Sequence, residues 1–323
     1  VHSVSGCSIL TIGMTVMPPT LALRLVPWFF VFLWSTGFIV ARYGMPHASP
    51  FLFLCARFLL SGALLAGWAL VAKQGWPRSA RDWGTLALVG ILMQAGYLGG
   101  VWAAVKWGMG AGLVALIVSF QAVLTLLLMP RPPGVRREVL WMGAMISTAG
   151  VALVLWPRLQ AAWHGLDARS GGVAMWAAAL VALLGITLGT ILQKRRASQW
   201  DFRVTGAVQQ AGALIVMVPL ACLEPRQWDG APALWASLCW SVLALTIGAS
   251  SLLYFLIQRQ AAVSVGSTMH WVPSCTVAMA FVLFGEPAGW ELLLGTALAA
   301  WGISRVQRAV ARAAHANEAT KAT

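Results

Sequence analysis

Charged residues are scarce in this sequence. Asp, Glu, Lys and Arg make up 10% of its 323 residues, whereas 59% are hydrophobic. Soluble domains carry about 25% charged residues, so the composition excludes an ordinary soluble domain. The chain is long enough for roughly ten apolar helices of about 20 residues joined by short loops. Because helices satisfy their own backbone in lipid, we expect an all-α polytopic membrane protein.

Acidic residues are the scarcest charged group, with nine in the whole chain, and each is expected in a loop or at the end of an apolar run. They are Asp82, Glu138, Asp167, Asp201, Glu224, Asp229, Glu286, Glu291 and Glu318. No carboxylate is therefore predicted at the membrane midplane, where coupled carriers often place a proton- or ion-binding acid. In a carrier, this pattern would favour uncoupled or weakly coupled transport over ion-driven transport. Glu286, which precedes a proline and an apolar run, is expected to cap a helix.

Motifs for metal, redox and nucleotide chemistry are also missing. The five cysteines are scattered without a CxxC pair, which favours thiols packed in the membrane over disulfides or a metal site. The sequence has no HExxH zinc motif and no GxxxxGK[ST] phosphate-binding loop. A metalloprotease and an ATP-driven pump are therefore disfavoured, and we expect no metal and no cofactor.

Ten apolar runs are separated by glycine, proline and charged residues. They cover residues 25–43, 50–72, 84–105, 110–129, 138–156, 172–193, 203–223, 234–257, 262–284 and 289–307. With the N-terminus inside, 16 of the 22 Lys and Arg residues lie on the inner side and 5 on the outer side. This positive-inside bias predicts that both termini are cytoplasmic. The net charge of +13 is thus explained by orientation in the lipid bilayer, and nucleic acid is not an expected partner.

The two halves of the chain resemble each other. "SGALL" (61–65) resembles "AGALI" (211–215), and "GAMISTAGV" (143–151) resembles "GTALAAWGI" (295–303), at offsets of 150 and 152 residues. Because five is an odd number of spans, two such repeats must be inverted relative to each other. The predicted organisation is a poorly ordered leader (1–24), a first five-helix repeat (25–156), an outer linker (157–171), a second five-helix repeat (172–307) and a basic cytoplasmic tail (308–323). The leader lacks a signal-peptide pattern, and Met14 or Met17 is an alternative start.

An ordered set of short motifs carries a family resemblance. These motifs are "WSTGFIVAR" (34–42), "ARFLLSGALL" (56–65), "HWVP" (270–273) and "LFGEP" (283–287), followed by a glycine-rich last span. Together they resemble the drug/metabolite transporter superfamily, EamA type, and within it the YddG-like exporters of aromatic amino acids. Gly285–Glu286 matches a Gly-Glu signature of the family that the first half lacks. The resemblance implies a secondary exporter of small organic solutes, working by alternating access in the inner membrane of a bacterial cell, with a monomer as one possible state.

The resemblance further implies a midplane cavity surrounded by the first, third, fourth, sixth, eighth and ninth spans. Polar and aromatic residues at helical spacing in these spans are the candidates for substrate binding. They are Trp34, Phe38, Gln94, Tyr97, Gln121, Trp176, Ser250, Ser251, Tyr254, His270, Trp271 and Ser274. Pro273 is the candidate hinge, because it removes a backbone hydrogen bond. Ser and Gln also join helices in membranes, so packing is the competing explanation for each of them.

Other interpretations of the sequence are compatible with the same residues. Arg57 lies in the second span, where structural pairing is favoured over contact with a substrate carboxylate. "GASS" (248–251) with His270 allows an intramembrane Ser–His hydrolase, although the glycine expected after the nucleophile is missing. An exporter of another metabolite or drug, or a channel, is also compatible with ten spans. We expect a transporter rather than an enzyme.

Overall fold

The computed structural model describes residues 19–128, 134–163, 172–197, 199–252, 271–285 and 289–322. Over these residues the chain is helical and contains no β-strand. Seven helices in this part of the chain are long and apolar enough to cross a membrane, and Ala111–Thr125 and Val272–Phe284 are shorter apolar helices. The predicted all-helical membrane fold is confirmed at this level. The number of ten spans, their inverted arrangement and the side of the termini stay predictions.

The first half of the chain contains five helical stretches, three of them continuous and two divided. In order the elements are α1 (Pro19–Gly44), α2 (Pro50–Val71), α3 (Ala80–Gly90) with the π-helix η1 (Ile91–Leu98) and α4 (Gly99–Lys106), α5 (Ala111–Ser119) with α6 (Gln121–Leu128), and α7 (Arg137–Trp163). The run predicted at 84–105 thus changes its helical winding in the middle. The run predicted at 110–129 is interrupted at Phe120.

The second half shows the same alternation of regular and π-helical winding. Its elements are α8 (Gly172–Leu192) with η2 (Gln193–Ala197), α9 (Phe202–Leu223), α10 (Pro232–Cys239) with η3 (Trp240–Ala249), α13 (Val272–Phe284) and α14 (Trp290–Ala322). The π-helix η3 lies in the eighth predicted span, and η1 lies in the third. Wide helical turns of this kind often occur at functional sites.

Helix starts follow local chemistry. Pro50 occupies the first turn of α2, where its missing N–H leaves no bond unmade. The side chain of Asp201 accepts a hydrogen bond from the Arg203 backbone N–H at the start of α9. The bounds of these two helices lie within one residue of prediction. Two other helices are longer than predicted: α1 begins at Pro19 inside the expected leader, and α14 continues through the expected tail to Ala322.

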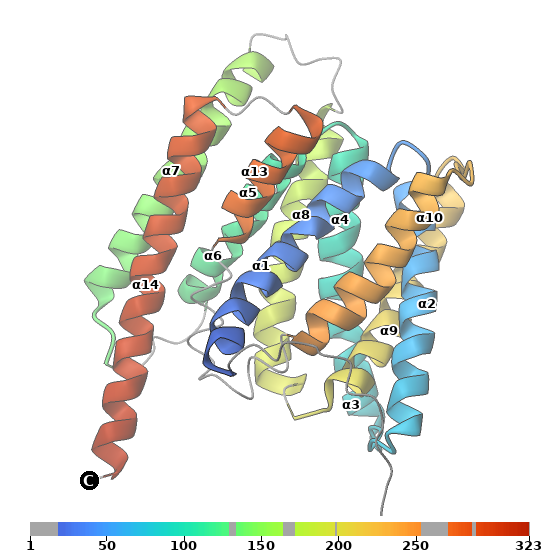
Figure 1. The fold of residues 1–323 in the computed structure, drawn as a ribbon, viewed down its shortest axis with the longest axis horizontal. Helices are drawn as coiled ribbons and strands as arrows, with labels where there is room; N and C mark the ends of the chain where they lie inside the picture. The colour runs from blue at the N-terminus through green and yellow to red at the C-terminus, as the bar shows by residue number, and fades with distance from the viewer. Residues whose placement is uncertain are drawn as a thin grey trace, which may run out of the picture.

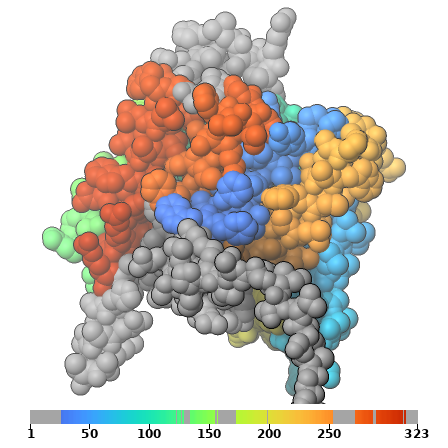
Figure 2. Space-filling model, in the orientation of Figure 1, coloured from blue at the N-terminus to red at the C-terminus, as the bar shows by residue number. Residues whose placement is uncertain are grey.

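Helices far apart in sequence pack along one another. The helix α2 packs on α9, α5 on α13, and α7 on α14, which form the red and green pair in Figure 1. The composite helix of η1 and α4 packs on α8, and α1 packs on η3 and α10. In the space-filling view, α14, α13, α1 and α10 follow one another across a single face (Figure 2). The core therefore lies between the two halves of the chain.

Glycines allow α7 and α14 to touch through their backbones. A Cβ added at Gly150 would lie 2.5 Å from the Gly295 carbonyl oxygen, and one at Gly302 would lie 2.6 Å from the Gly143 carbonyl oxygen. Apolar helices in lipid gain no hydrophobic driving force from association, so close packing at small residues has to hold them together. The two "G-x₆-G" motifs of the sequence therefore meet at this crossing.

Replacing Gly150 by leucine is expected to destabilise this crossing by about 1–3 kcal/mol, because the new side chain would collide with the backbone of α14. Thermal unfolding of the purified protein in detergent measures the effect. Gly67→Leu is the matched control, since a Cβ at Gly67 would meet no atom within 4 Å. Equal melting temperatures for the two variants would contradict the packing assigned to Gly150.

Candidate functional site

A cavity of about 110 Å³ lies between the two halves of the chain. Its walls come from α1, α2, η1, α4, α8, α9 and η3, and from Ser250, which directly follows η3. The lining residues are Trp34, Gly37, Phe38, Arg57, Met93, Gln94, Tyr97, Leu98, Val101, Trp102, Ile186, Gln210, Leu245, Thr246 and Ser250. This volume is below the roughly 300–1,000 Å³ of pockets for drug-sized ligands, so the cavity suits a small solute.

The wall formed by η1 depends on a close approach to α8. A Cβ added at Gly185 would lie 2.6 Å from the Leu92 carbonyl oxygen and 2.8 Å from the Tyr97 backbone nitrogen. Only glycine fits there without moving one of the helices. The close contact fixes the backbone from which Tyr97 and Gln94 reach the cavity.

Aromatic rings form much of the apolar wall. Trp34 is half-buried, and its ring centroid lies 5.4 Å from that of Phe30. Trp102 is buried and stacks on Phe53, with centroids 4.4 Å apart and an angle of 22° between the rings. Offset stacks of this kind fix ring orientation as well as burying apolar area. The cavity therefore offers flat apolar surfaces to a solute.

Polar groups in the cavity are few and incompletely paired. Arg57 is 6% exposed, and its Nη2 donates to Thr246 Oγ1 at 3.5 Å. Within the described residues, Arg57 Nε has no hydrogen-bond partner. Gln210 is 2% exposed, and its Oε1 likewise has no partner in the part of the chain that the structure describes. An unpaired buried polar atom costs about 1–3 kcal/mol, so a ligand group that reached either atom would relieve this cost.

The structure brings five of the predicted substrate-binding residues together in this cavity: Trp34, Phe38, Gln94, Tyr97 and Ser250. Tyr254 and His270 lie outside the described residues. The predicted contact of these residues with a substrate stays a prediction.

The remaining predicted residues lie elsewhere. Gln121 Nε2 donates to Thr190 Oγ1 at 3.2 Å and so joins α6 to α8. Trp176 packs half-buried against the core, and the Ser251 hydroxyl is buried without a partner among the described residues. Trp271 is 45% exposed with its ring 5.9 Å from that of Trp28. Packing is therefore the better explanation for Gln121.

The proposed hinge and its neighbour lie on α13. Ser274 is half-buried in this helix. Pro273 lies in the first turn of α13, which begins at Val272. A proline in that position removes no hydrogen bond within the described helix. A role of Pro273 in bending the span would thus have to involve residues before 271, outside the described part.

Three polar lining residues were absent from the predicted set: Arg57, Gln210 and Thr246. The sequence favours structural pairing for Arg57, whereas its only hydrogen bond among the described residues is the long one to Thr246. Gln210 lies on α9, the seventh span, which was not expected to line the cavity. A signal existed in the sequence, because charged and amide side chains in the middle of apolar runs mark functional positions.

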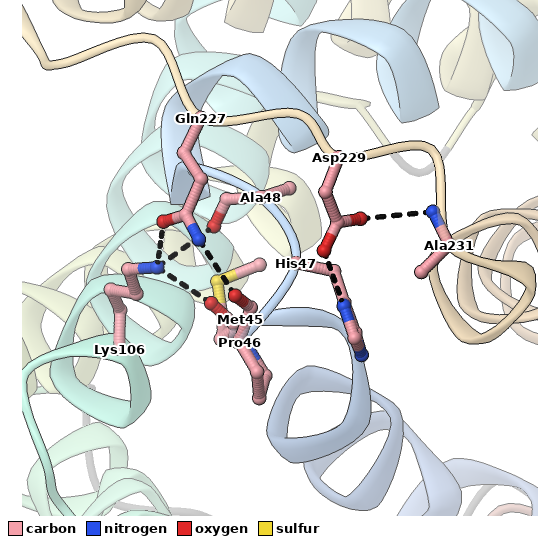
Figure 3. Close-up of polar contacts among 8 residues, drawn as sticks. All are labelled: Met45, Pro46, His47, Ala48, Lys106, Gln227, Asp229 and Ala231. Atoms are coloured by element: carbon pink, nitrogen blue, oxygen red, sulfur yellow. Dashed lines mark hydrogen bonds and ion pairs between the residues drawn. The ribbon is translucent and has the colours of Figure 1, made fainter.

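A second polar cluster, here called the polar lock, joins the loop at 45–49 to the loop at 224–231 and to Lys106 at the end of α4 (Figure 3). Lys106 Nζ donates to the Met45 carbonyl at 2.7 Å and to Gln227 Oε1 at 2.6 Å. Gln227 Nε2 in turn donates to the Pro46 carbonyl at 2.7 Å. Lys106 follows the cavity residue Trp102 by about one helical turn, so the polar lock lies near the cavity along α4.

Two carboxylates extend the polar lock. Glu224 Oε1 accepts the Leu52 N–H at 2.8 Å and so caps the start of α2 from a distant part of the chain. Burial nevertheless raises the pKa of Glu224. Asp229 Oδ2 lies 2.7 Å from His47 Nδ1, and Asp229 Oδ1 accepts the Ala231 N–H at 2.9 Å. The Ala231 N–H and the His47 ring lower the pKa of Asp229.

The lowered pKa of Asp229 predicts an acid-sensitive contribution to stability. Since the folded-state pKa lies below the unfolded value, the contribution is complete above the ordinary aspartate pKa and is lost as the pH falls through the lowered value. The difference in melting temperature between wild type and Asp229→Asn should therefore shrink as the pH falls below about 4. A difference that grows on acidification from about pH 5 to about pH 3 would contradict this assignment.

Comparison with known proteins finds similarity to membrane transporters. Residues 26–156 match the EamA-like transporter family. The chain is 24% identical over 262 residues to the uncharacterized inner membrane transporter YedA of Escherichia coli K12, a match that covers 79% of this chain and 80% of YedA. YedA of the strains O6:H1 and O157:H7 matches to the same extent. A solved crystal structure matches with a TM-score of 0.59 at 20% identity, over 88% of this chain and 96% of that one, and supports the fold alone.

Proposed function

We propose that this chain is an EamA-type member of the drug/metabolite transporter superfamily that exports small organic metabolites across an inner membrane. The observation that carries the proposal is the cavity, because helices of both halves line it and its walls are apolar and aromatic with few polar groups. Ligand sites in helical bundles commonly have this composition. The match of residues 26–156 to the EamA-like transporter family adds support, since it covers nearly the whole predicted first repeat.

Alternating access requires two related halves, and the helix packing supports their presence. If each span is paired with the span five positions later, α2 with α9, α5 with α13 and α7 with α14 are equivalent pairs, and each pair is in contact. The contact of η1 and α4 with α8 then corresponds to the contact of η3 and α10 with α1. Packing that repeats on exchange of the halves is expected around a two-fold axis in the membrane plane.

The glycine contacts between α7 and α14 also support two related halves. The repeat equates Gly143 with Gly295 and Gly150 with Gly302. Across the interface Gly150 meets Gly295, and Gly302 meets Gly143. Such an exchange of partners is typical of an isologous contact, in which the same surface is used twice. The proposed inverted repeat explains this pattern, which a chance pairing of two helices would not require.

Amino acids with aromatic or other hydrophobic side chains are the substrates we favour. Trp34, Phe38 and Tyr97 offer apolar and stackable surfaces, and Gln94 and Ser250 offer hydrogen bonds. Among the described lining residues none is acidic, which supports transport down the substrate's own gradient rather than coupled transport.

Counterflow in proteoliposomes tests the function. Vesicles loaded with unlabelled phenylalanine, tryptophan or methionine should accumulate the labelled amino acid transiently and saturably. Accumulation should persist when pH and membrane potential are clamped, because no coupling ion is proposed. Failure of every amino acid to give counterflow would contradict the substrate assignment, and flux that does not saturate with substrate would favour a channel.

A further inference from the structure

Two residues of the cavity lining each carry a buried polar atom that has no partner within the described residues, and the two atoms are complementary. Arg57 Nε is a donor on a cation, Gln210 Oε1 is an acceptor, and neither has a hydrogen-bond partner within the described residues. Both side chains are more than nine-tenths buried. Both belong to the lining of the same cavity, from α2 and α9 respectively. A ligand that satisfied both would need an acceptor group, anionic to balance the guanidinium, close to a donor group.

We propose that Arg57 and Gln210 recognise the polar head of a zwitterionic α-amino acid, with the guanidinium of Arg57 binding the carboxylate and the Gln210 carboxamide oxygen accepting from the ammonium. This inference rests on the proposed transport function and assigns its specificity to two residues of α2 and α9. The apolar rings of the cavity would then receive the side chain of the amino acid.

Arg57 is suited to a carboxylate because its charge is buried and has no counter-ion among the described residues. No ion pair involves Arg57 within the described part of the chain, and its contact with Thr246 Oγ1 at 3.5 Å is at the long limit for a hydrogen bond. Guanidinium stays charged and presents a planar set of donors that matches a carboxylate. A bound carboxylate would compensate the buried charge, which otherwise costs several kcal/mol.

The charge balance favours a carboxylate over a phosphate. Arg57 is the only charged residue among the described residues that line the cavity. One cation neutralises a monoanionic carboxylate, whereas a phosphate dianion would remain uncompensated in an apolar site. Gln210 Oε1 is an acceptor, so it cannot hydrogen-bond an anionic oxygen but can accept from an ammonium group. One cation with one acceptor therefore favours a zwitterion with an uncharged side chain.

The geometry allows both residues to reach one small molecule. A Cβ added at Gly62 of α2 would lie 3.1 Å from Gln210 Cβ, so α2 and α9 are in close contact at this level. Arg57 precedes Gly62 by five residues, which is about 7.5 Å along the axis of a helix. Long arginine and glutamine side chains that extend into the same cavity can bridge such a separation. The glycine at position 62 thus sets the distance between the two polar groups.

The test is competition in proteoliposome counterflow with labelled phenylalanine. Phenethylamine lacks the carboxylate, and 3-phenylpropionate lacks the ammonium. For the wild-type protein each analogue should compete with labelled phenylalanine at least about tenfold more weakly than unlabelled phenylalanine does, because each leaves one buried group unpaired. Arg57→Gln should lose the preference for phenylalanine over phenethylamine, and Gln210→Leu should lose the preference over 3-phenylpropionate. Should a variant give no counterflow, the same ratios are read from ligand-induced thermal shifts of the purified protein.

Gln209→Leu is the matched control. Gln209 is also buried on α9, but its Nε2 donates to Gln193 Oε1 at 2.6 Å, outside the cavity. Its competition ratios should equal those of the wild type even if its melting temperature falls. Wild-type ratios for Arg57→Gln and Gln210→Leu would overturn this inference and leave the transport function intact. Stronger competition by inorganic phosphate than by 3-phenylpropionate would also overturn it. Absence of counterflow with any amino acid in the wild type would overturn the proposed function itself.

Discussion

Replacing Trp34 by alanine is expected to lower the rate of counterflow by about tenfold or more. The half-buried indole of Trp34 lines the cavity, so its removal takes away an apolar surface that a transported side chain would cover. A loss of about 1.4 kcal/mol in substrate binding corresponds to a tenfold change. Initial rates in proteoliposomes of equal protein content, at subsaturating substrate, measure the effect.

Trp290→Ala is the control for this substitution. The ring of Trp290 is 65% exposed at the start of α14, away from the cavity. Its loss should leave counterflow within about twofold of wild type, as expected for a surface change. If Trp34→Ala transports at the wild-type rate while the protein remains folded, Trp34 has no part in substrate binding.

Replacing Lys106 by methionine is expected to open the polar lock. The ammonium group of Lys106 makes three hydrogen bonds, to the carbonyls of Met45 and Ala48 and to Gln227 Oε1, and methionine can replace none of them. The loops at 45–49 and 224–231 would keep only the contacts they make directly with each other, such as Ser49 N–H to the Gln227 carbonyl at 2.9 Å. The conformation that is open on this face should therefore become more populated.

The measurement is the rate at which a membrane-impermeant thiol reagent, applied from the face of the polar lock, reacts with Ser250→Cys. Ser250 lines the cavity, and its replacement by cysteine in a background free of the five native cysteines changes little in size. Lys106→Met should raise this rate about tenfold, which corresponds to a shift of about 1.4 kcal/mol between two states.

Arg226→Met is the matched control, since Arg226 is an exposed cation of the loop at 224–231 that Lys106 contacts. It alters the charge of this face to the same extent without removing the hydrogen bonds of Lys106. An unchanged labelling rate in Lys106→Met, or an equal increase in both variants, would contradict the role assigned to the polar lock.

Much of the helical framework was predictable because its signals are local. Long apolar runs bounded by prolines and charges gave α2 and α9 to within one residue of their bounds. The π-helical winding of η1 and η3 was not predictable, because it has no residue signature that differs from ordinary helix. The interruption at Phe120 likewise follows no glycine or proline at that position. The polar lock joins loops more than 170 residues apart, which no local pattern could pair.

The candidate site was predictable only in part, for a related reason. Trp34, Gln94 and Tyr97 stand out as polar or aromatic groups at helical spacing, and the structure places them in the cavity. Gln121 and Trp271 carry the same signal but lie elsewhere, because sequence spacing does not tell which face of a helix meets the other half of the chain. Gln210 was missed because the contact between α2 and α9, which directs it inward, depends on the three-dimensional packing.

Substrate protection of a thiol inside the cavity is the most direct test that this cavity is the transport site. Ser250→Cys, in the cysteine-free background and in proteoliposomes, would be labelled in the presence of increasing concentrations of a transported amino acid. Labelling should slow by about tenfold at saturation, with half-protection at the concentration that half-saturates counterflow. A labelling rate independent of the amino acid, in a variant that still carries out counterflow, would show that the substrate binds elsewhere.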